Sequence, residues 1–437
     1  MPCGTIGTDA SVEALYARRE TTYKEGGAAA DLLAFPFENH SLQGNVTFED
    51  NPLIFAGRQR GLGRLVSRSA TGDINTRLSF GETIYEQVLE SAFFTDTAFS
   101  GQAEIGILDP DGVTAGQDDD VTFDTSTTNE VNISVVDDTP FTSVVVGDVI
   151  RLGGMDATVG VSGTATGDAA LLEHRHLRVI TKASANDITC AVDATLWATL
   201  TGGTAIFDTS AIDTALYVAR PSYIQNGATC DSFYIERQFS TIAGQHIGYE
   251  GMVPSSTTLS AALGESMVFS TSWLGSLENP DSAAGTQGDG APTPAIQNDL
   301  ISAIDTIEVI ENGTVVAALR SFSFTLDNAL RARENLGVSG AVSIGSDVPA
   351  IGGSGVLEFS DATFMERFEA DTANNFLWRI VDIADRAYII DAPEARVTEA
   401  PTPNTGQGND LLTNFSWTAG LDPVHGFTCR MYRVPTP

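Results

Sequence analysis

The stretch Phe269-Ser-Thr-Ser-Trp-Leu-Gly275 ends one structural block, and Ser416-Trp417 ends a second copy of it. Four landmarks recur in the same order: a strand ending in Asp-Asn, a strand leading into a helix, a paired-strand region and the tryptophan strand. The first three occupy residues 46–51, 78–93 and 233–254 in one copy, and residues 324–328, 357–368 and 377–393 in the other. The alternative is chance similarity between two β-rich stretches. Because the order is kept, we interpret the pattern as an internal duplication.

Each copy carries Thr-x-x-Glu where its helix should begin, as Thr83-Ile-Tyr-Glu86 and Thr363-Phe-Met-Glu366. This spacing predicts a capping box, in which the hydroxyl and the carboxylate accept from backbone donors of the first turn. Apolar residues then recur at helical spacing, which predicts one buried face on each helix. The faces are Ile84, Tyr85, Val88, Leu89, Ala92 and Phe93 in the first helix and Phe364, Met365 and Phe368 in the second.

The two copies differ in length. The helices begin their apolar faces 280 residues apart, at Ile84 and Phe364, whereas Trp273 and Trp417 are 144 residues apart. The first copy therefore holds 136 residues that the second lacks, and they must lie between Phe94 and Phe233. Short β runs separated by Gly, Asp and Asn in this interval predict a small inserted β domain.

The chain has 437 residues, which exceeds what one hydrophobic core usually serves and predicts two to four domains. We expect an N-terminal arm at 1–40, a first module at 41–104 and 226–280, an insert at 105–225, a linker at 281–300 and a second module at 301–437. Within the arm, residues 12–19 suggest a short helix. In the second module, Asn312-Gly313 between alternating apolar residues predicts a tight hairpin.

The formal charge of −34 comes from 57 acidic and 23 basic residues. Such a surface disfavours a nucleic-acid reader, because phosphate binding needs clustered Lys and Arg. A salty habitat is an alternative cause of the acid excess. The interval from Asp109 to Asp213 holds 17 acidic and four basic residues, a net of −13. We therefore expect the insert to be strongly acidic.

A search for chemistry yields no catalytic, cofactor or metal site. The sequence has no phosphate-binding loop ending in Gly-Lys and no His-Glu-x-x-His helix. His174 and His176 are interpreted as a surface pair, and Asp118-Asp119-Asp120 as a solvated acidic turn. The four cysteines lack metal-ligand spacing, and no apolar run reaches membrane-spanning length. We expect a protein that is not an enzyme.

One basic segment stands out, with Arg58, Arg60, Arg64 and Arg68 in a Gly-punctuated loop. Guanidinium groups form bidentate pairs with carboxylates, so these four arginines are candidates for contacts between subunits. The alternative is a solvated loop that balances the acidic surface of its own chain.

The set of segments resembles the major tail tube proteins of long, noncontractile-tailed bacteriophages (the siphovirus type). The resemblance is carried by residues 71–80, the helix at 83–93, residues 232–239, 248–252 and 269–275, and the second-copy stretch from 321 to 368. It implies a mainly β chain with two tandem β-sandwich or half-barrel modules, each with a flanking α-helix, plus the inserted small β domain. Inner sheets of neighbouring subunits would join into a barrel around a channel.

The resemblance implies a structural virion protein of the phage tail, made and assembled in the host cytoplasm, whose stacked rings form the channel for genome DNA. Two modules per chain predict a homotrimeric, pseudo-sixfold ring; a ring of six whole chains is the alternative. Expected partners are further copies of the chain, a length-determining tape-measure protein, tail terminator and tip proteins, and DNA passing without specific binding. We expect carboxylates to line the bore. Alternative functions are a virion decoration protein or a β-rich carbohydrate-active or carbohydrate-binding protein.

Overall fold

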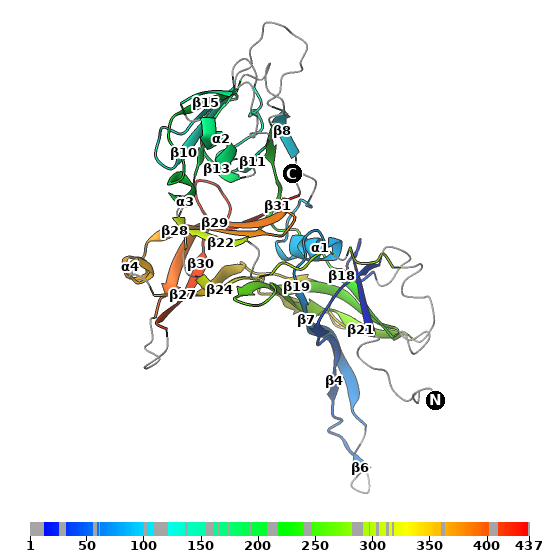
Figure 1. Cartoon of the computed structure of the whole chain (residues 1–437). Helices are drawn as coiled ribbons and strands as arrows, with labels where there is room; N and C mark the ends of the chain where they lie inside the picture. The colour runs from blue at the N-terminus through cyan, green and yellow to red at the C-terminus, as the bar shows by residue number, and fades with distance from the viewer. Residues whose placement is uncertain are drawn as a thin grey trace, which may run out of the picture.

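The computed structural model describes most of the chain. The described residues are 13–25, 32–55, 59–60, 62–99, 103–107, 121–135, 139–153, 161–164, 166–172, 175–192, 194–207, 217–239, 246–281, 292–296, 298–302, 306–311, 314–316, 319–359, 363–401 and 410–435. They form a mainly β structure in which one extended sheet system carries both copies and a second sheet forms a separate lobe (Figure 1).

A continuous inner sheet runs through both copies in the order β4-β7-β20-β19-β24-β27-β30-β29, with every pair antiparallel. The strands of the first copy are β4 (Gln43–Glu49), β7 (Arg64–Arg77), β20 (Val268–Gly275) and β19 (His246–Ala262). Those of the second copy are β24 (Leu319–Asp327), β27 (Ala350–Glu358), β30 (Leu412–Ala419) and β29 (Ala387–Glu399). The same four-strand order thus occurs twice, and β19 joins β24 edge to edge.

The registers show how closely the copies correspond. Trp273 pairs with Gly72 on one side and Pro254 on the other, while Trp417 pairs with Gly353 and Val397. In both copies, a register shift follows directly, so that Ser272 pairs with Ser256 and Ser416 with Glu399. A bulge conserved between the two halves bends β19 and β29 at equivalent points. The tryptophan and paired-strand landmarks are confirmed by this pairing.

The Asp-Asn landmark is wrong in the first copy: its apolar residues were matched four residues too late, and its Asp-Asn pair five residues too late. Phe324 pairs with Gly353, and Leu42 passes directly against Gly72, so Leu42 is the structural equivalent of Phe324. Phe324 is buried, whereas Val46, which the sequence pattern matched to it, is exposed. The cause is that β4 continues past the core as one arm of a long hairpin. Apolar and polar residues alternate there, but neither side of the strand packs on the core.

An outer sheet covers each half of the inner sheet. In the first copy it comprises β1 (Glu13–Arg19), β2 (Leu33–Ala34), β18 (Phe233–Phe239), the N-terminal half of β19 and β21 (Leu277–Asp281). In the second it comprises β22 (Thr306–Glu311), β23 (Thr314–Val315), β28 (Ala373–Val381), the N-terminal half of β29, β31 (Arg430–Val434) and β17 (Ser222–Gln225). Short ladders complete the sheets: β3 (Asn39–His40) on β7, β5 (Ile54–Phe55) with β6 (Gln59–Arg60), and β25 (Arg331–Arg333) with β26 (Ser343–Gly345).

The helix expected at residues 12–19 is contradicted. Residues 13–19 form β1, which pairs with β18 along its whole length and buries Leu15 and Ala17 in alternation. Seven residues cannot sustain an isolated helix, so strand pairing decides their conformation. The hairpin expected around Asn312-Gly313 has its flanking pair, Glu311 opposite Thr314, although the two turn residues lie outside the described residues.

One hydrophobic core extends through both copies. Trp273 packs edge-on against Phe233, and Trp417 stacks on Phe322. Helix α1 (Thr83–Ala92) lies between the copies, because its C-terminal neighbour Phe93 stacks on Phe324 of β24. Its predicted apolar face is confirmed, since every member is buried. In the shorter α4 (Thr363–Ala370), Phe364 is buried, but Met365 and Phe368 are exposed, so that part of the prediction is wrong.

The capping box expected at α1 is absent. Thr83 is already the first helical residue, Glu82 holds the cap position, and no side chain caps the end. The Glu86 carboxylate instead binds groups of the second copy. Thr363 likewise begins α4, and its side chain lies outside the described residues.

The residues between the first-copy segments form a separate nine-stranded sheet, ordered β12-β15-β9-β10-β14-β13-β11-β16-β8. Its strands are β8 (Ala103–Ile107), β9 (Val121–Asp124), β10 (Glu130–Val135), β11 (Val149–Gly153), β12 (Val161–Gly163), β13 (His176–Ser184), β14 (Asp187–Ala191), β15 (Thr204–Phe207) and β16 (Tyr217–Arg220), with helices α2 (Thr166–Leu172) and α3 (Ala194–Trp197). It has its own apolar core, which includes Phe123 and Ile150. We call this unit the insert.

The insert enters the sequence within the first copy but packs on the second. Val149 of β11 shares a small apolar cluster with Ile389 of β29 and with Tyr432 and Val434 of β31. These side chains lie on the face of the outer sheet opposite the main core, to which Ile390 and Met431 belong. The insert therefore stands on the side away from the inner sheet (Figure 1).

Candidate assembly surfaces

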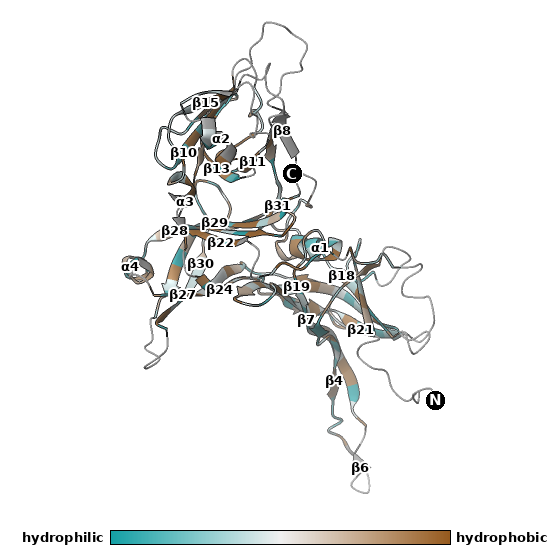
Figure 2. Cartoon of the chain, viewed as in Figure 1, coloured by the Kyte–Doolittle hydropathy of each residue, from teal (hydrophilic) through white to brown (hydrophobic). Residues whose placement is uncertain are grey.

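The longest projection is a ribbon formed by β4 and the N-terminal half of β7, with β5 and β6 near its tip (Figure 1). Hydrophobic and hydrophilic residues alternate along it (Figure 2). Phe48 is 68% exposed and Leu62 is 94% exposed, and the other exposed apolar residues are Val46, Leu53 and Val66. An apolar ribbon that leaves the body of a chain is typical of a contact surface. We call it the basic ribbon because of its arginines.

The structure places two of the four candidate arginines. Arg64 and Arg68 are exposed, with exposed Val66 between them. Arg64 pairs with Glu49 and Arg68 with Val46, and the register shift between these pairs places the two arginines on opposite sides of the ribbon. Arg60 lies in β6, but its side chain is not described, and Arg58 lies outside the described residues. Near the ribbon base, the Ser67 hydroxyl donates to Glu334, which follows the short basic strand β25. The sequence identified the charges here but not the exposed apolar side chains.

The two ends of the inner sheet are complementary edges. Among the described residues, β4 pairs with β7 alone, and residues 397–399 of β29 pair with β30 alone. The internal junction shows what such edges can form: residues 256–262 of β19 pair with residues 321–327 of β24. The registers make β4 the first-copy equivalent of β24, and β29 the second-copy equivalent of β19. The free edges of β4 and β29 are thus equivalent to the two edges that meet in the internal junction. Unpaired strand edges are templates for a further strand.

One carboxylate occupies part of the β4 edge. The backbone N–H of Gly44 donates to Glu278 Oε2 at 2.7 Å, and a Cβ on Gly44 would approach the Glu278 Cβ within 2.6 Å. Glycine is thus required for this close approach. The contact uses one of the donors that a neighbouring strand would need.

Helix α1 seals the junction between the copies with polar contacts as well as apolar ones. Glu86 Oε1 accepts from the Tyr388 hydroxyl at 2.9 Å and from Arg433 Nε at 2.5 Å. The Tyr388 hydroxyl in turn accepts from the Gly81 N–H at 3.0 Å. Full burial raises the pKa of Tyr388 well above its ordinary value, so it stays a donor. Asn328 completes the junction by donating to the Ala92 carbonyl at 2.9 Å.

Helix α4 occupies the equivalent place in the second copy, where two of its apolar side chains are exposed. Phe364 packs on Phe415, and Arg367 pairs with the buried Glu311, which fixes the helix on its own copy. Phe368 is 46% exposed and Met365 is 36% exposed. We call these two side chains the α4 face.

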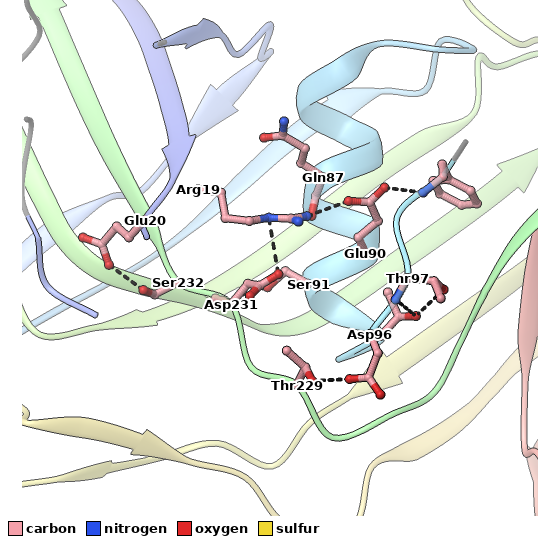
Figure 3. Close-up of polar contacts among 12 residues, drawn as sticks. Arg19, Glu20, Gln87, Glu90, Ser91, Asp96, Thr97, Thr229, Asp231 and Ser232 are labelled. Carbon is pink, nitrogen blue, oxygen red and sulfur yellow. Dashed lines mark hydrogen bonds and ion pairs between the residues drawn. The ribbon is translucent and has the colours of Figure 1, made fainter. Parts of the chain in front are cut away.

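The N-terminal strand is held by a partly buried polar cluster beside α1 (Figure 3). Arg19 of β1 donates to Glu90 of α1 at 2.6 Å and approaches Asp231 at 3.3 Å. The other Glu90 oxygen accepts from the Phe99 N–H at 2.6 Å. Burial raises the pKa of Glu90 despite these contacts. The cluster links the arm, the helix and the chain entering β18, which places the arm within the fold of its own copy.

Ion pairs fix the insert to the outer sheet. Arg178 of β13 pairs with Asp391 of β29, a carboxylate with no exposed surface whose pKa is raised by burial. Buried Asp148 lies 3.4 Å from Arg220 and 3.6 Å from Arg430. Arg151 donates to the Pro435 carbonyl at 2.9 Å. Buried pairs of this kind make the relative position of two units specific.

A cavity of about 370 Å³ lies along this insert seam, and it is lined by Arg175, His176, Arg379 and apolar side chains. His176 was interpreted as one of a surface pair, but it faces this cavity, and His174 lies outside the described residues. Within the described residues, no group of three or more His, Cys, Asp or Glu side chains could hold a metal. Likewise, no described helix is long and apolar enough to cross a membrane.

The comparisons with known proteins give one family. A model of the family described as phage tail tube protein matches residues 10–419. No curated protein matches the chain.

Proposed function

The chain belongs to the phage tail tube protein family and is a structural tail tube subunit; from this premise we propose that three copies close into a ring of six modules. Rings of this kind stack into the tube of the virion tail, through which genome DNA passes. Each of the two copies described above is one tube module, and the insert is an addition to the second.

The internal junction between β19 and β24 carries this proposal. It is a complete example, within one chain, of how one module joins the next. Repeating it between chains would bring Glu399, at the end of β29, opposite Asn45 of a neighbour's β4, because Glu399 corresponds to Ser256 and Asn45 to Asp327. Three chains with eight inner strands each would form a closed barrel of about 24 strands and leave no free edge.

The helices support the same ring. In one chain, the C-terminal end of α1 contacts the second module, because Phe93 stacks on Phe324 and Asn328 donates to the Ala92 carbonyl. The exposed α4 face of one chain would lie at the seam with the first module of the next chain. A ring therefore covers the exposed Met365 and Phe368, which an isolated chain leaves in water.

Stacking of rings is assigned to the basic ribbon. Arg58, Arg60, Arg64 and Arg68 would meet carboxylates of the adjacent ring, while the exposed apolar residues of the ribbon pack beside them. The insert lies on the outer sheet and would face away from the channel. A tape-measure protein inside the tube, and terminator and tip proteins at its ends, complete the proposed set of partners, with assembly in the host cytoplasm.

Native mass measurement of isolated rings tests the stoichiometry. A chain of 46.1 kDa predicts rings of about 138 kDa for three copies. Rings of six copies, at twice that mass, would overturn the trimer while leaving the tube role intact. Electron microscopy of the same sample should show stacked rings with a central hole; single chains or flat arrays would count against the tube role and favour a decoration protein.

A further inference from the structure

The cavity along the insert seam has no part in the proposed assembly. Its volume is about 370 Å³, and it lies between the insert and the outer sheet of the second copy (Figure 1). Strands β13 and β14 and helix α3 of the insert build one side, and β22 and β28 build the other. Sites for small molecules commonly measure about 300–1,000 Å³ and often lie where two domains meet. The seam therefore leaves room for a small ligand.

Strand alternation explains which side chains reach the cavity. Val179 of β13 belongs to the core of the insert, so the adjacent Arg178 faces the seam. Trp378 of β28 belongs to the main core in the same way, so Leu377 and Arg379 on either side of it line the cavity. The cavity thus lies between two sheet faces, each of which contributes a guanidinium group.

Much of the cavity wall is aliphatic. Ile180, Ala191 and Leu196 contribute from the insert, and Ile310 and Leu377 contribute from the second copy. Side chains of this kind offer no hydrogen bonds, and contact with them removes apolar surface of a ligand from water. The wall therefore favours a ligand whose body is apolar.

One cation of the cavity differs from the others in its partners. Arg178 pairs with Asp391, and Arg379 lies 2.5 Å from Glu308. Arg175 is partly exposed, and among the described contacts it donates only to a backbone carbonyl, at 3.4 Å. A guanidinium group can donate two parallel hydrogen bonds to one carboxylate. Arg175 is thus the group best placed to bind an anionic part of a ligand.

A carboxylate on the same wall limits the charge that a ligand can carry. Glu130 also lines the cavity. It pairs in register with Ala191, which pairs with Arg178, so the three residues form one row across the sheet of the insert. A ligand with two anionic groups would bring the second toward Glu130, and like charges repel more strongly away from bulk water. A single negative charge fits the cavity better.

We propose that this cavity binds a small organic acid that carries one carboxylate on an apolar body. Arg175 would hold the carboxylate, while Ile180, Leu196 and Leu377 surround the body. Because both units line the cavity, the bound acid would also stabilise the docking of the insert on the second copy. The proposal depends neither on the number of chains in a ring nor on the stacking of rings.

Isothermal titration calorimetry of the full-length chain tests the chemistry of the site. The probes are benzoate, which carries one carboxylate on an apolar ring, and benzamide, its uncharged counterpart of similar shape. Benzoate should bind at one site per chain, at least about tenfold more tightly than benzamide, because only benzoate forms a charge-assisted pair. Arg175→Gln should weaken benzoate about tenfold and leave benzamide unchanged.

Arg331→Gln is the matched control, because Arg331 is an exposed arginine of β25 outside the cavity lining. It should change the affinity for neither probe. The absence of saturable heat with benzoate at millimolar concentrations would overturn the proposal. So would an Arg175→Gln chain that binds benzoate as tightly as the wild type.

Ala191→Leu tests the location of the site, because the larger side chain would occupy space beside Arg178. The variant should bind neither probe. Saturating benzoate should raise the melting temperature of the wild type but not that of Ala191→Leu. Unchanged benzoate binding by Ala191→Leu would place the probe elsewhere and refute this site. Each of these results leaves the tube role untouched, since none of the measurements involves assembly.

Discussion

Replacing the α4 face tests the seam between chains most directly. Burying a whole Phe or Met side chain contributes about 1.5–3 kcal/mol. Phe368 and Met365 are 46% and 36% exposed. Burying the exposed part of each side chain on ring closure should therefore stabilise the seam by roughly 1 kcal/mol. The double change Phe368→Ala and Met365→Ala should weaken each seam by about 2 kcal/mol, or roughly 30-fold in association.

Glutamate at both positions should have a larger effect. A carboxylate left without a partner in the seam adds at least about 2 kcal/mol of desolvation cost, so association should fall by about 1000-fold. The separate chain should keep its thermal stability, because both side chains already contact water. Mass photometry across a concentration series measures the shift from rings to single chains.

Matched variants separate assembly from folding. Val88→Glu, on the buried face of α1, should lower the melting temperature of the separate chain, because Val88 has no exposed surface. Leu171→Glu, an exposed apolar residue of the insert, should leave both rings and stability unchanged. If the Phe368→Glu and Met365→Glu double variant forms rings with wild-type affinity, the assignment of the α4 face to a chain-to-chain seam is wrong.

Four further outcomes are expected. Arg64→Glu with Arg68→Glu should leave rings intact but abolish stacking, seen as short or absent tubes in micrographs, whereas Arg175→Glu on the insert should not; normal tubes from the ribbon variant would argue for a solvated loop. Glu278→Ala should speed ring formation in light scattering, because it frees the Gly44 donor at the β4 edge; slower formation would show that the contact supports the edge instead. The raised pKa of Glu90 means that the folded state binds its proton more tightly, so relative to Glu90→Gln the wild type should gain unfolding free energy as pH falls from neutral through that pKa; urea titrations with the opposite slope would contradict the burial effect. Arg178→Ala should destabilise the insert seam by about 3–5 kcal/mol by leaving Asp391 buried and unpaired, and adding Asp391→Asn should restore much of the loss in thermal unfolding; equal melting temperatures for wild type and Arg178→Ala would remove this role.

The duplication, the α1 face and the β-rich fold could be predicted because they depend on local periodicity and on a core that both copies share. Residues 13–19 could not, because a seven-residue segment takes its conformation from the strand beside it, here β18. Val46 and Phe48 were matched to buried residues because alternation reports a pleated strand, not which of its faces meets the core. Glu86 fits a capping box equally well in sequence, yet its partners Tyr388 and Arg433 lie more than 300 residues away.

The candidate surfaces also divide into features that the sequence predicts and features that depend on strand order. The arginines of the ribbon were visible as a cluster of charge in an acidic chain. The complementary edges were not, because an unpaired edge depends on strand order, and the order emerges only when β19 meets β24.

The two copies have diverged in a way that fits their unequal positions in the proposed ring. The junction inside the chain is closed at α1 by the stacking of Phe93 on Phe324 and by four polar contacts, and it never has to form by association. The junction between chains relies on the shorter α4 and on an edge that Glu278 partly occupies. Fusion thus reduces the seams formed by collision from six to three, and because the long ribbon belongs to the first copy, each ring offers three ribbons to its neighbour. In such a ring, each seam between chains is weak until the third chain closes the ring. If the ribbons then bind only a completed ring, the tube grows by adding rings at its end and single chains do not associate at random.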